Sequence, residues 1–156
     1  MENSPKIYKS SVRDVSFSTN VTIVEPVNLY ECHIGADCFI GPFVEIQKGV
    51  EIGANTKIQS HTFICELVKI GSDCFVGHGV MFINDLFKEG GPATGDVTKW
   101  EKTIIGDNVS LGSNSTILPV NICSNVVIGA GSVVTRDIID PGVYAGNPAR
   151  FKGKIK

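Results

Sequence analysis

Residues 34 to 82 have the sequence IGADCF IGPFVE IQKGVE IGANTK IQSHTF ICELVK IGSDCF VGHGVM F when it is divided into blocks of six. An aliphatic or aromatic residue opens every block from Ile34 to Phe82, and glycine follows it in five of the nine blocks. Two positions before each opening residue lies a small or β-branched side chain, such as Cys38, Val44 or Thr56. This register is too regular to arise by chance.

A period of six matches neither the 3.6-residue period of an amphipathic helix nor the alternation of a half-buried strand. Glycine at this frequency would also destabilise a helix by about 1 kcal/mol per residue. Short strands joined by tight corners fit instead. If three blocks form a three-sided coil of roughly 18 residues, the opening residues stack in columns about 4.8 Å apart and build a continuous core. The sequence therefore predicts an all-β fold, a parallel β-helix of hexapeptide repeats.

Repeats extend over most of the chain, which we interpret as one domain of 156 residues. The pattern resumes downstream at Ile105, Leu111, Ile117, Ile122, Ile128 and Val134, with one block, 117–122, a residue short. Upstream, a six-residue spacing followed by a seven-residue step to Ile34 predicts a start near Val12 and one local bulge; the spaced residues are Val15, Val21 and Val27. A C-terminal tail is expected at about 136–156.

Residues 85 to about 103 interrupt the repeat. This stretch contains Gly90, Gly91, Pro92, Gly95 and the single tryptophan, Trp100. We expect a long loop that projects from one corner of the prism. Because a regular solenoid does not need such a loop, and long loops in compact domains are usually functional or disordered, the insertion favours a functional role.

Composition excludes several classes of function. The formal net charge is −2, with 14 basic and 16 acidic residues spread along the chain, so no basic stripe predicts nucleic-acid binding. No apolar run approaches the roughly 20 residues that span a bilayer, and no signal peptide opens the chain, so we expect a cytoplasmic protein. Five cysteines without CxxC or zinc spacing are expected to be reduced; three of them, Cys32, Cys38 and Cys74, occupy inward positions and are interpreted as core filler.

Three segments narrow the family. These are QSHTFICE at 59–66, GHGVMFIND at 77–85, and GAGSVV at 129–134 together with GNPAR at 146–150. With them, residues 34–150 resemble bacterial hexapeptide-repeat acyltransferases, and among these the nucleotide-sugar N-acetyltransferases of surface polysaccharide (lipopolysaccharide) biosynthesis. The resemblance implies a left-handed coil and a homotrimer with active sites between subunits. It also implies acetyl-CoA as acyl donor and a dTDP- or UDP-linked amino sugar as acceptor.

The resemblance also suggests where the coenzyme lies. The Gly-Asn-Pro-Ala-Arg segment is similar to the region that borders the adenine, so Asn147 and Pro148 are candidate contacts, with Arg150, Lys152 or Lys154 available for phosphates. The matching segment around Ala130 would also face the coenzyme. Backbone N–H groups of Gly112 or Ser113 are candidates for stabilising the thioester oxyanion. Relatives commonly have Ile-Leu-Pro-Gly-Val where this chain has 117–120 as Ile-Leu-Pro-Val.

Candidate catalytic residues follow from stacking at intervals of about 18 residues. His78 should stack on Ser60, and Asn84 on Glu66, next to Asp85. We expect this polar cluster of Glu66, Asn84 and Asp85 at the root of the loop to bind the sugar amine. In some relatives an asparagine orients the amine while the departing sulfur takes the proton, a role that Asn84 would carry. Candidate bases are His78 and His61; Trp100 would stack on a nucleotide base or pin the loop to the prism.

The sequence leaves three alternative functions to compare with the N-acetyltransferase. An O-acetyltransferase of a sugar or small hydroxyl acceptor shares the repeat and the cofactor, but depends on a histidine base because a hydroxyl is costly to deprotonate. A non-catalytic scaffold would need neither the loop nor the polar cluster. A γ-type carbonic anhydrase needs three histidines around zinc, but His33, His61 and His78 share no column. No metal is therefore expected.

Overall fold

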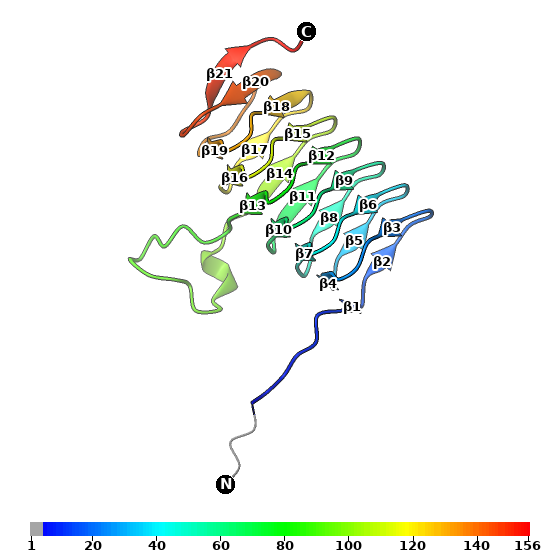
Figure 1. Cartoon of the computed structure of the whole chain (residues 1–156). Helices are drawn as coiled ribbons and strands as arrows, with labels where there is room; N and C mark the ends of the chain where they lie inside the picture. Colours follow the sequence, from blue (N-terminus) through cyan, green and yellow to red (C-terminus); the bar gives the residue numbers. More distant parts are fainter. Residues whose placement is uncertain (1–4) are drawn as a thin grey trace.

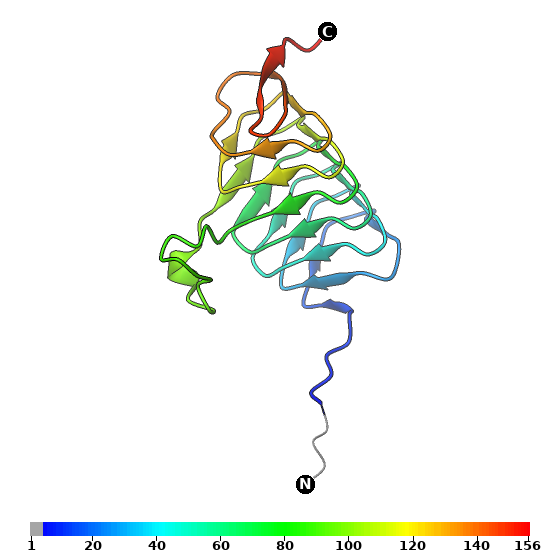
Figure 2. The same ribbon diagram turned by 60° about the vertical axis from the view of Figure 1, so that its left-hand side comes forward.

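The computed structural model describes residues 5–156 as a prism whose three sides are parallel β-sheets (Figure 1). The chain winds through about seven turns, and Figure 2 shows the coils stacked along the prism axis. Each full coil contributes one short strand to each sheet, because an inward aliphatic residue recurs every six positions. The predicted all-β, left-handed parallel β-helix of hexapeptide repeats is confirmed.

The sheets are named A, B and C. Sheet A contains β1 (Val12–Arg13), β4 (Asn28–Tyr30), β7 (Glu45–Ile46), β10 (Phe63–Ile64), β13 (Met81–Phe82), β16 (Thr116–Ile117) and β19 (Val133–Val134). Sheet B contains β2 (Ser16–Phe17), β5 (His33–Ile34), β8 (Glu51–Ile52), β11 (Val68–Ile70), β14 (Thr103–Ile105) and β17 (Asn121–Ile122). Sheet C contains β3 (Thr22–Ile23), β6 (Phe39–Ile40), β9 (Lys57–Ile58), β12 (Phe75–Val76), β15 (Ser110–Leu111), β18 (Val126–Ile128), β20 (Gly142–Ala145) and β21 (Arg150–Gly153).

The core consists of the predicted columns. Ile64 pairs with Ile46, and Ile70 pairs with Ile52, each 18 residues along the chain. These side chains are at most 3% exposed. The cysteines interpreted as core filler are buried as expected, and burial raises the pKa of the Cys32 thiol to about 11. A thiol with so high a pKa is mostly protonated at neutral pH and is a poor nucleophile.

The predicted start near Val12 is confirmed, since β1 pairs with β4, but the upstream register is wrong. Strand pairing places Phe17 opposite Ile34, 17 residues away, and β3 and β4 keep the same offset to their partners. The coil therefore lacks one residue between Leu29 and Ile34, where we expected an inserted one. A seven-residue and a five-residue step differ by two, which is the side-chain period of a strand, so both registers point apolar residues inward. The residues that we placed in the wrong column are Val15, Val21 and Val27.

All irregularities of the coil fall at the corner between sheets A and B, which we call the loop corner. The short side after Leu29 lies there, and so does the predicted short block between Ile117 and Ile122, which is confirmed by 17-residue pairing offsets. The long loop leaves the same corner, between β13 and β14, and carries the 3₁₀ helix η1 (Val97–Lys99) (Figure 1). One edge of the prism thus absorbs every change in repeat length.

The predicted C-terminal tail is structured. β20 extends sheet C by pairing with β18, and β21 turns back antiparallel to β20. Tyr144 packs edge-on against Phe151, with ring centroids 5.4 Å apart. This hairpin covers the C-terminal end of the prism (Figure 1). Within residues 5–156, no helix has the length and apolar character needed to cross a membrane.

Candidate functional site

The corner between sheets C and A, which we call the histidine corner, carries both candidate histidine bases. It is formed by residues 59–61, 77–79, 112–114 and 129–131 in successive coils. The Gly79 N–H donates to the carbonyl of Ser60, and the Asn114 N–H donates to the carbonyl of His78, at 3.0 and 2.8 Å. These backbone bonds hold the corner residues of successive coils in one column.

His78 and His61 differ in how their rings are held. The Nδ1 atom of His78 lies 2.9 Å from the hydroxyl oxygen of Ser60, as stacking predicted, and His78 is exposed. The ring of His61 instead packs against that of Phe43, with centroids 4.8 Å apart. No polar side chain within residues 5–156 hydrogen-bonds to His61. The structure therefore orients His78 by a hydrogen bond and His61 by an apolar contact.

The two backbone N–H groups predicted to stabilise the oxyanion, those of Gly112 and Ser113, differ in their hydrogen bonding. The Gly112 N–H donates to the carbonyl of Ile128 at 2.8 Å, so it is engaged in the β-ladder. The Ser113 N–H has no acceptor within residues 5–156, and Ala130 follows Ser113 along the corner, since the Gly131 N–H donates to the Ser113 carbonyl at 2.8 Å. Ser113 is the better-placed donor because its amide is not consumed by the β-ladder.

The C-terminal hairpin extends the histidine corner by one more step. The Gly129 N–H donates to Tyr144, and the Val133 N–H donates to Gly146, so the turn that holds Asn147 and Pro148 lies directly beyond Ala130. These two residues are exposed, as are Arg150 and Lys152 on β21. The structure thus aligns most of the predicted coenzyme contacts along one edge of the prism; they are Ser113, Ala130, Asn147, Pro148, Arg150 and Lys152.

At the loop corner, Asn84 lies directly above Glu66. The Asn84 side-chain Nδ2 donates to the Glu66 carbonyl at 3.3 Å, and the Asn84 carbonyl accepts from the Glu101 N–H at 2.9 Å. The predicted stacking is therefore present, and the loop returns to the prism beside Asn84. Nδ2 uses one of its two N–H groups in this bond. The Oδ1 atom accepts no hydrogen bond within residues 5–156, so it is available to accept one from a ligand.

The surroundings of Glu66 are electronegative. Burial, followed by the charges of Glu45 and Glu66, raises the pKa of the half-buried Tyr30. The Glu31 carboxylate, which pairs with Lys48 at 3.0 Å, raises the pKa of that exposed lysine. Carboxylates at this corner therefore favour positive charge and hydrogen-bond donors over anions.

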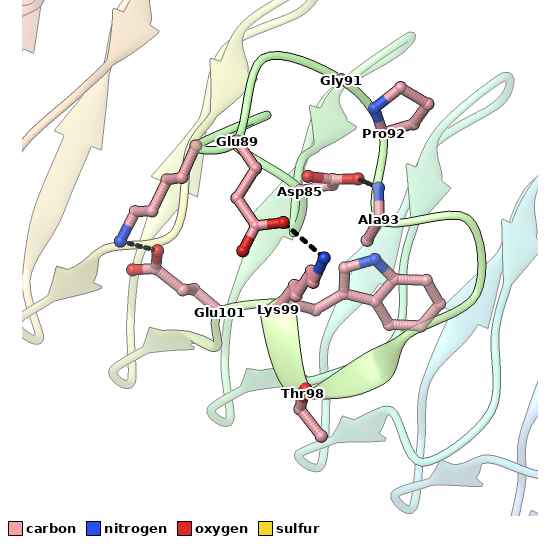
Figure 3. A pocket seen from close by; sticks show the side chains of 10 residues that line it. Asp85, Glu89, Gly91, Pro92, Ala93, Thr98, Lys99 and Glu101 are labelled. Carbon is pink, nitrogen blue, oxygen red and sulfur yellow. Dashed lines mark hydrogen bonds and ion pairs between the residues drawn. The ribbon is translucent and has the colours of Figure 1, made fainter.

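The Asp85 carboxylate is hydrogen-bonded to the backbone of the loop. Its carboxylate oxygens accept from the Phe87 N–H at 2.9 Å. They also accept from the Ala93 N–H at 2.7 Å, the bond that Figure 3 shows. The expected role in substrate binding is thus accompanied by a structural one, in which Asp85 holds the two arms of the loop together. Sequence reasoning could not find these bonds because loop backbone has no periodicity.

The loop encloses a hollow of about 400 Å³, lined by loop residues alone. Two ion pairs join residues that line it, Lys99 to Glu89 and Lys88 to Glu101, and neither was predicted (Figure 3). Half-buried Trp100 lines the hollow. Asp96 caps η1 by accepting from the Thr98 N–H at 3.1 Å. The loop is therefore a folded unit with its own contacts.

The candidate residues form two groups in a single chain. The histidine corner holds His61, His78 and the coenzyme candidates, whereas the loop corner holds Glu66, Asn84, Asp85 and Trp100. β13 lies between the groups, with His78 before it and Asn84 after it. His33 lies apart on sheet B, and within the described residues no cluster of three or more His, Cys, Asp or Glu side chains is arranged to hold a metal ion.

Comparison with known proteins agrees with the repeats. Residues 31–66 match the bacterial transferase hexapeptide model (six repeats), and residues 102–136 match the hexapeptide repeat of succinyl-transferase. A curated relative, the bifunctional protein GlmU of Clostridium botulinum, is 38% identical over 109 residues, which are 69% of this chain and 21% of the relative. The chain thus spans about a fifth of that relative's length.

Two solved structures share the fold. AntD, an N-acyltransferase from Bacillus cereus whose mutant was solved with dTDP and coenzyme A, aligns with a TM-score of 0.71 at 24% identity, over 91% of this chain and 80% of AntD. A galactoside acetyltransferase in complex with coenzyme A aligns with a TM-score of 0.67 at 30% identity, over 79% of this chain and 64% of that one. The repeats, the coil and these matches identify the chain as a member of the hexapeptide-repeat transferases.

Proposed function

We propose that the chain is an acetyl-CoA-dependent N-acetyltransferase that acts on the amino group of a dTDP- or UDP-linked sugar, in the cytoplasm and for surface polysaccharide biosynthesis. The observation that carries the proposal is the Asn84–Glu66 stack at the root of the loop. It presents a carboxamide oxygen beside carboxylates, which matches an acceptor that brings N–H donors.

The amine is the group that this corner fits. Asn84 Oδ1 accepts one N–H of the neutral amine and thereby directs the nitrogen lone pair away from itself, toward the thioester. The carboxylates of Glu66 and Glu45 favour the N–H donors of the amine over anionic groups. Holding the two reactants in an attack geometry converts a bimolecular reaction into an effectively unimolecular one, which lowers the barrier.

The histidine corner fits the coenzyme. A pantetheine arm that follows the column from His78 to Asn147 meets the free N–H of Ser113, which would stabilise the oxyanion. Arg150 and Lys152 then lie at the end of the column, where the phosphates of the nucleotide part would need cations. Coenzyme A bound to AntD and to the galactoside acetyltransferase supports this cofactor.

The reaction forms an N–C bond and breaks the C–S bond of the thioester. The amine loses one proton and the coenzyme sulfur gains one, so the products are an N-acetyl sugar and free thiol. The contact between His78 Nδ1 and Ser60 supports His78 Nε2 as the group that carries this proton. Transfer by a positioned base contributes about 10²- to 10⁴-fold to such reactions.

The assembly proposed is a homotrimer in which the histidine corner of one subunit meets the loop corner of the next. The separation of the two groups by β13 supports this arrangement, because the histidine corner of one subunit and the loop corner of another can together form one site. Partly exposed apolar side chains on the outer face of sheet A, Phe63 and Met81, offer surface for the contact.

An O-acetyltransferase is the second candidate. The ordered His78 would suit a hydroxyl acceptor, which needs a base more than an amine does, and the galactoside acetyltransferase shares 30% of aligned residues. The Asn84 corner favours the amine because a hydroxyl has a single proton to donate.

A thiol-release assay separates the candidates. Purified protein is incubated with acetyl-CoA and a panel of dTDP- and UDP-linked amino sugars, with galactosides and other hydroxyl acceptors alongside. We expect release with at least one amino sugar and little with its hydroxyl analogue. Release with hydroxyl acceptors alone would replace the proposal by the O-acetyltransferase, and no release with any acceptor would contradict both.

A further inference from the structure

At the histidine corner, a serine hydroxyl contacts the imidazole of His78. Ser60 Oγ and His78 Nδ1 are 2.9 Å apart, and the two residues are 18 positions apart in adjacent coils. Ser60 is half-buried and His78 exposed, so the contact forms where the prism meets solvent. Their backbones are fixed as well, because the Gly79 N–H donates to the Ser60 carbonyl at 3.0 Å.

The geometry leaves one ring nitrogen of His78 for chemistry. Nδ1 is engaged by Ser60, and Nε2 has no hydrogen-bond partner within residues 5–156. In a neutral imidazole one nitrogen carries the proton and the other carries the lone pair. If Nδ1–H donates to the serine oxygen, Nε2 has the lone pair and can accept a proton. If the hydroxyl donates to Nδ1, Nε2 is protonated and cannot act as a base.

We propose that Ser60 is a positioning residue for acetyl transfer, whose hydroxyl oxygen accepts from His78 Nδ1–H and fixes the tautomer in which Nε2 is the base. The inference rests on the proposed function, since it assigns a purpose to the orientation of His78. During the reaction, Nε2 takes the proton that the amine loses as the N–C bond forms. The resulting imidazolium donates that proton to the coenzyme sulfur as the C–S bond breaks, which returns His78 to its starting state.

The chain offers an internal control. Ser16 Oγ lies 3.3 Å from His33 Nδ1, a second serine–histidine pair stacked between adjacent coils. This pair lies on sheet B, away from the candidate site, and both residues are exposed. Ser16→Ala therefore removes an equivalent contact without touching the proposed machinery.

The first measurement is the tautomer of His78 at pH 9, where imidazole side chains are generally neutral. Proton–nitrogen correlation spectra of ¹⁵N-histidine-labelled full-length protein report which nitrogen is protonated, and the His78→Asn spectrum assigns the signal. We expect the Nδ1–H form in the wild type and a mixture dominated by Nε2–H in Ser60→Ala. If His78 of the wild type is in the Nε2–H form, the inference about Ser60 is overturned, whereas the proposed acetyltransferase function is not.

The second measurement is kinetic. We expect Ser60→Ala to lower kcat about tenfold with KM for acetyl-CoA unchanged, Ser60→Thr to restore it, and Ser16→Ala to match the wild type. An unchanged kcat in Ser60→Ala would overturn the positioning role, even if His78→Ala is inactive. A fully active His78→Ala would instead overturn the proposed base. The two failures are thus distinguishable, and circular dichroism shows whether each variant folds.

Discussion

The histidine corner and the loop corner lie at opposite ends of the same strand, β13, yet they are built by different rules. The histidine corner repeats almost without change in successive coils, and its backbone bonds run from Ser60 through His78 and Ser113. The loop corner takes up both short sides and the whole insertion. A regular edge can hold one extended cofactor, whereas a variable edge can acquire specificity for an acceptor.

The largest expected effect concerns the loop corner. Asn84→Ala should lower kcat/KM for the amino sugar by at least about 100-fold, because the amine loses the acceptor that orients it. The matched control is Asn55→Ala, which removes a carboxamide that donates to Asp73 at 2.7 Å on another corner. Initial rates of thiol release and size-exclusion chromatography test the pair. Full activity of Asn84→Ala in an intact assembly would remove Asn84 from the site.

The next effect compares the two histidines of the histidine corner. His78→Ala should lower kcat by about 100-fold, since a positioned base is lost. His61→Ala should change kcat by less than about threefold, because its ring packs on Phe43 and has no polar partner in the described chain. The same assay measures both variants. A larger loss of kcat in His61→Ala than in His78→Ala would identify His61, in the neighbouring coil, as the base.

A stability comparison tests how rigid each corner is. Gly79 has a φ of +65°, and a Cβ there would lie 2.5 Å from Asn114 Oδ1. Gly79→Ala should therefore destabilise the protein by about 1–3 kcal/mol. Gly91, in the loop, has open space around it, so Gly91→Ala should stay within about 0.5 kcal/mol of the wild type. Urea unfolding measures the free energy of unfolding of both variants. Equal losses of stability would contradict the conclusion that the histidine corner is tightly packed and that the loop has open space at Gly91.

The smallest effect is an opening of the loop in acid. Hydrogen bonds from Thr98 lower the pKa of Asp96 below its ordinary value. This cap is therefore present above the unfolded-state pKa and is lost as the pH falls through the folded-state pKa. Fluorescence of Trp100, the single tryptophan, should change below about pH 4 while far-UV circular dichroism stays constant. Asp96→Asn should lack this transition; an identical transition in that variant would exclude Asp96 as its origin.

The regular part of the molecule could be predicted from sequence because the core column and the corner glycines repeat the same physical constraint. Stacking at 18 residues placed Asn84 on Glu66 and His78 on Ser60 correctly. The register before Ile34 failed because apolar residues occupy both inward columns there, as buried Val27 and Leu29 illustrate. When two apolar columns lie two residues apart, the sequence does not tell whether the coil has gained or lost a residue.

The loop could not be predicted in the same way. Its contacts depend on turns and on two ion pairs, Lys88–Glu101 and Lys99–Glu89, that follow no period. The hydrogen bond from the Gly112 N–H to the β-ladder could not be predicted either, because sequence does not tell which amide at a corner is left without an acceptor. Sequence thus locates the edges of the prism, and the structure shows which groups on those edges are free.

The most direct test of the account is the chemical bond that the protein makes. Acetyl-CoA carrying a ¹³C label in its carbonyl is incubated with the protein and the amino sugar that releases thiol, and the product is treated with alkaline hydroxylamine before mass spectrometry and NMR. We predict a single labelled acetyl group that resists hydroxylamine, as an amide does, and whose formation requires Asn84. A label that hydroxylamine removes would identify an ester and contradict the assignment of the loop corner to an amine.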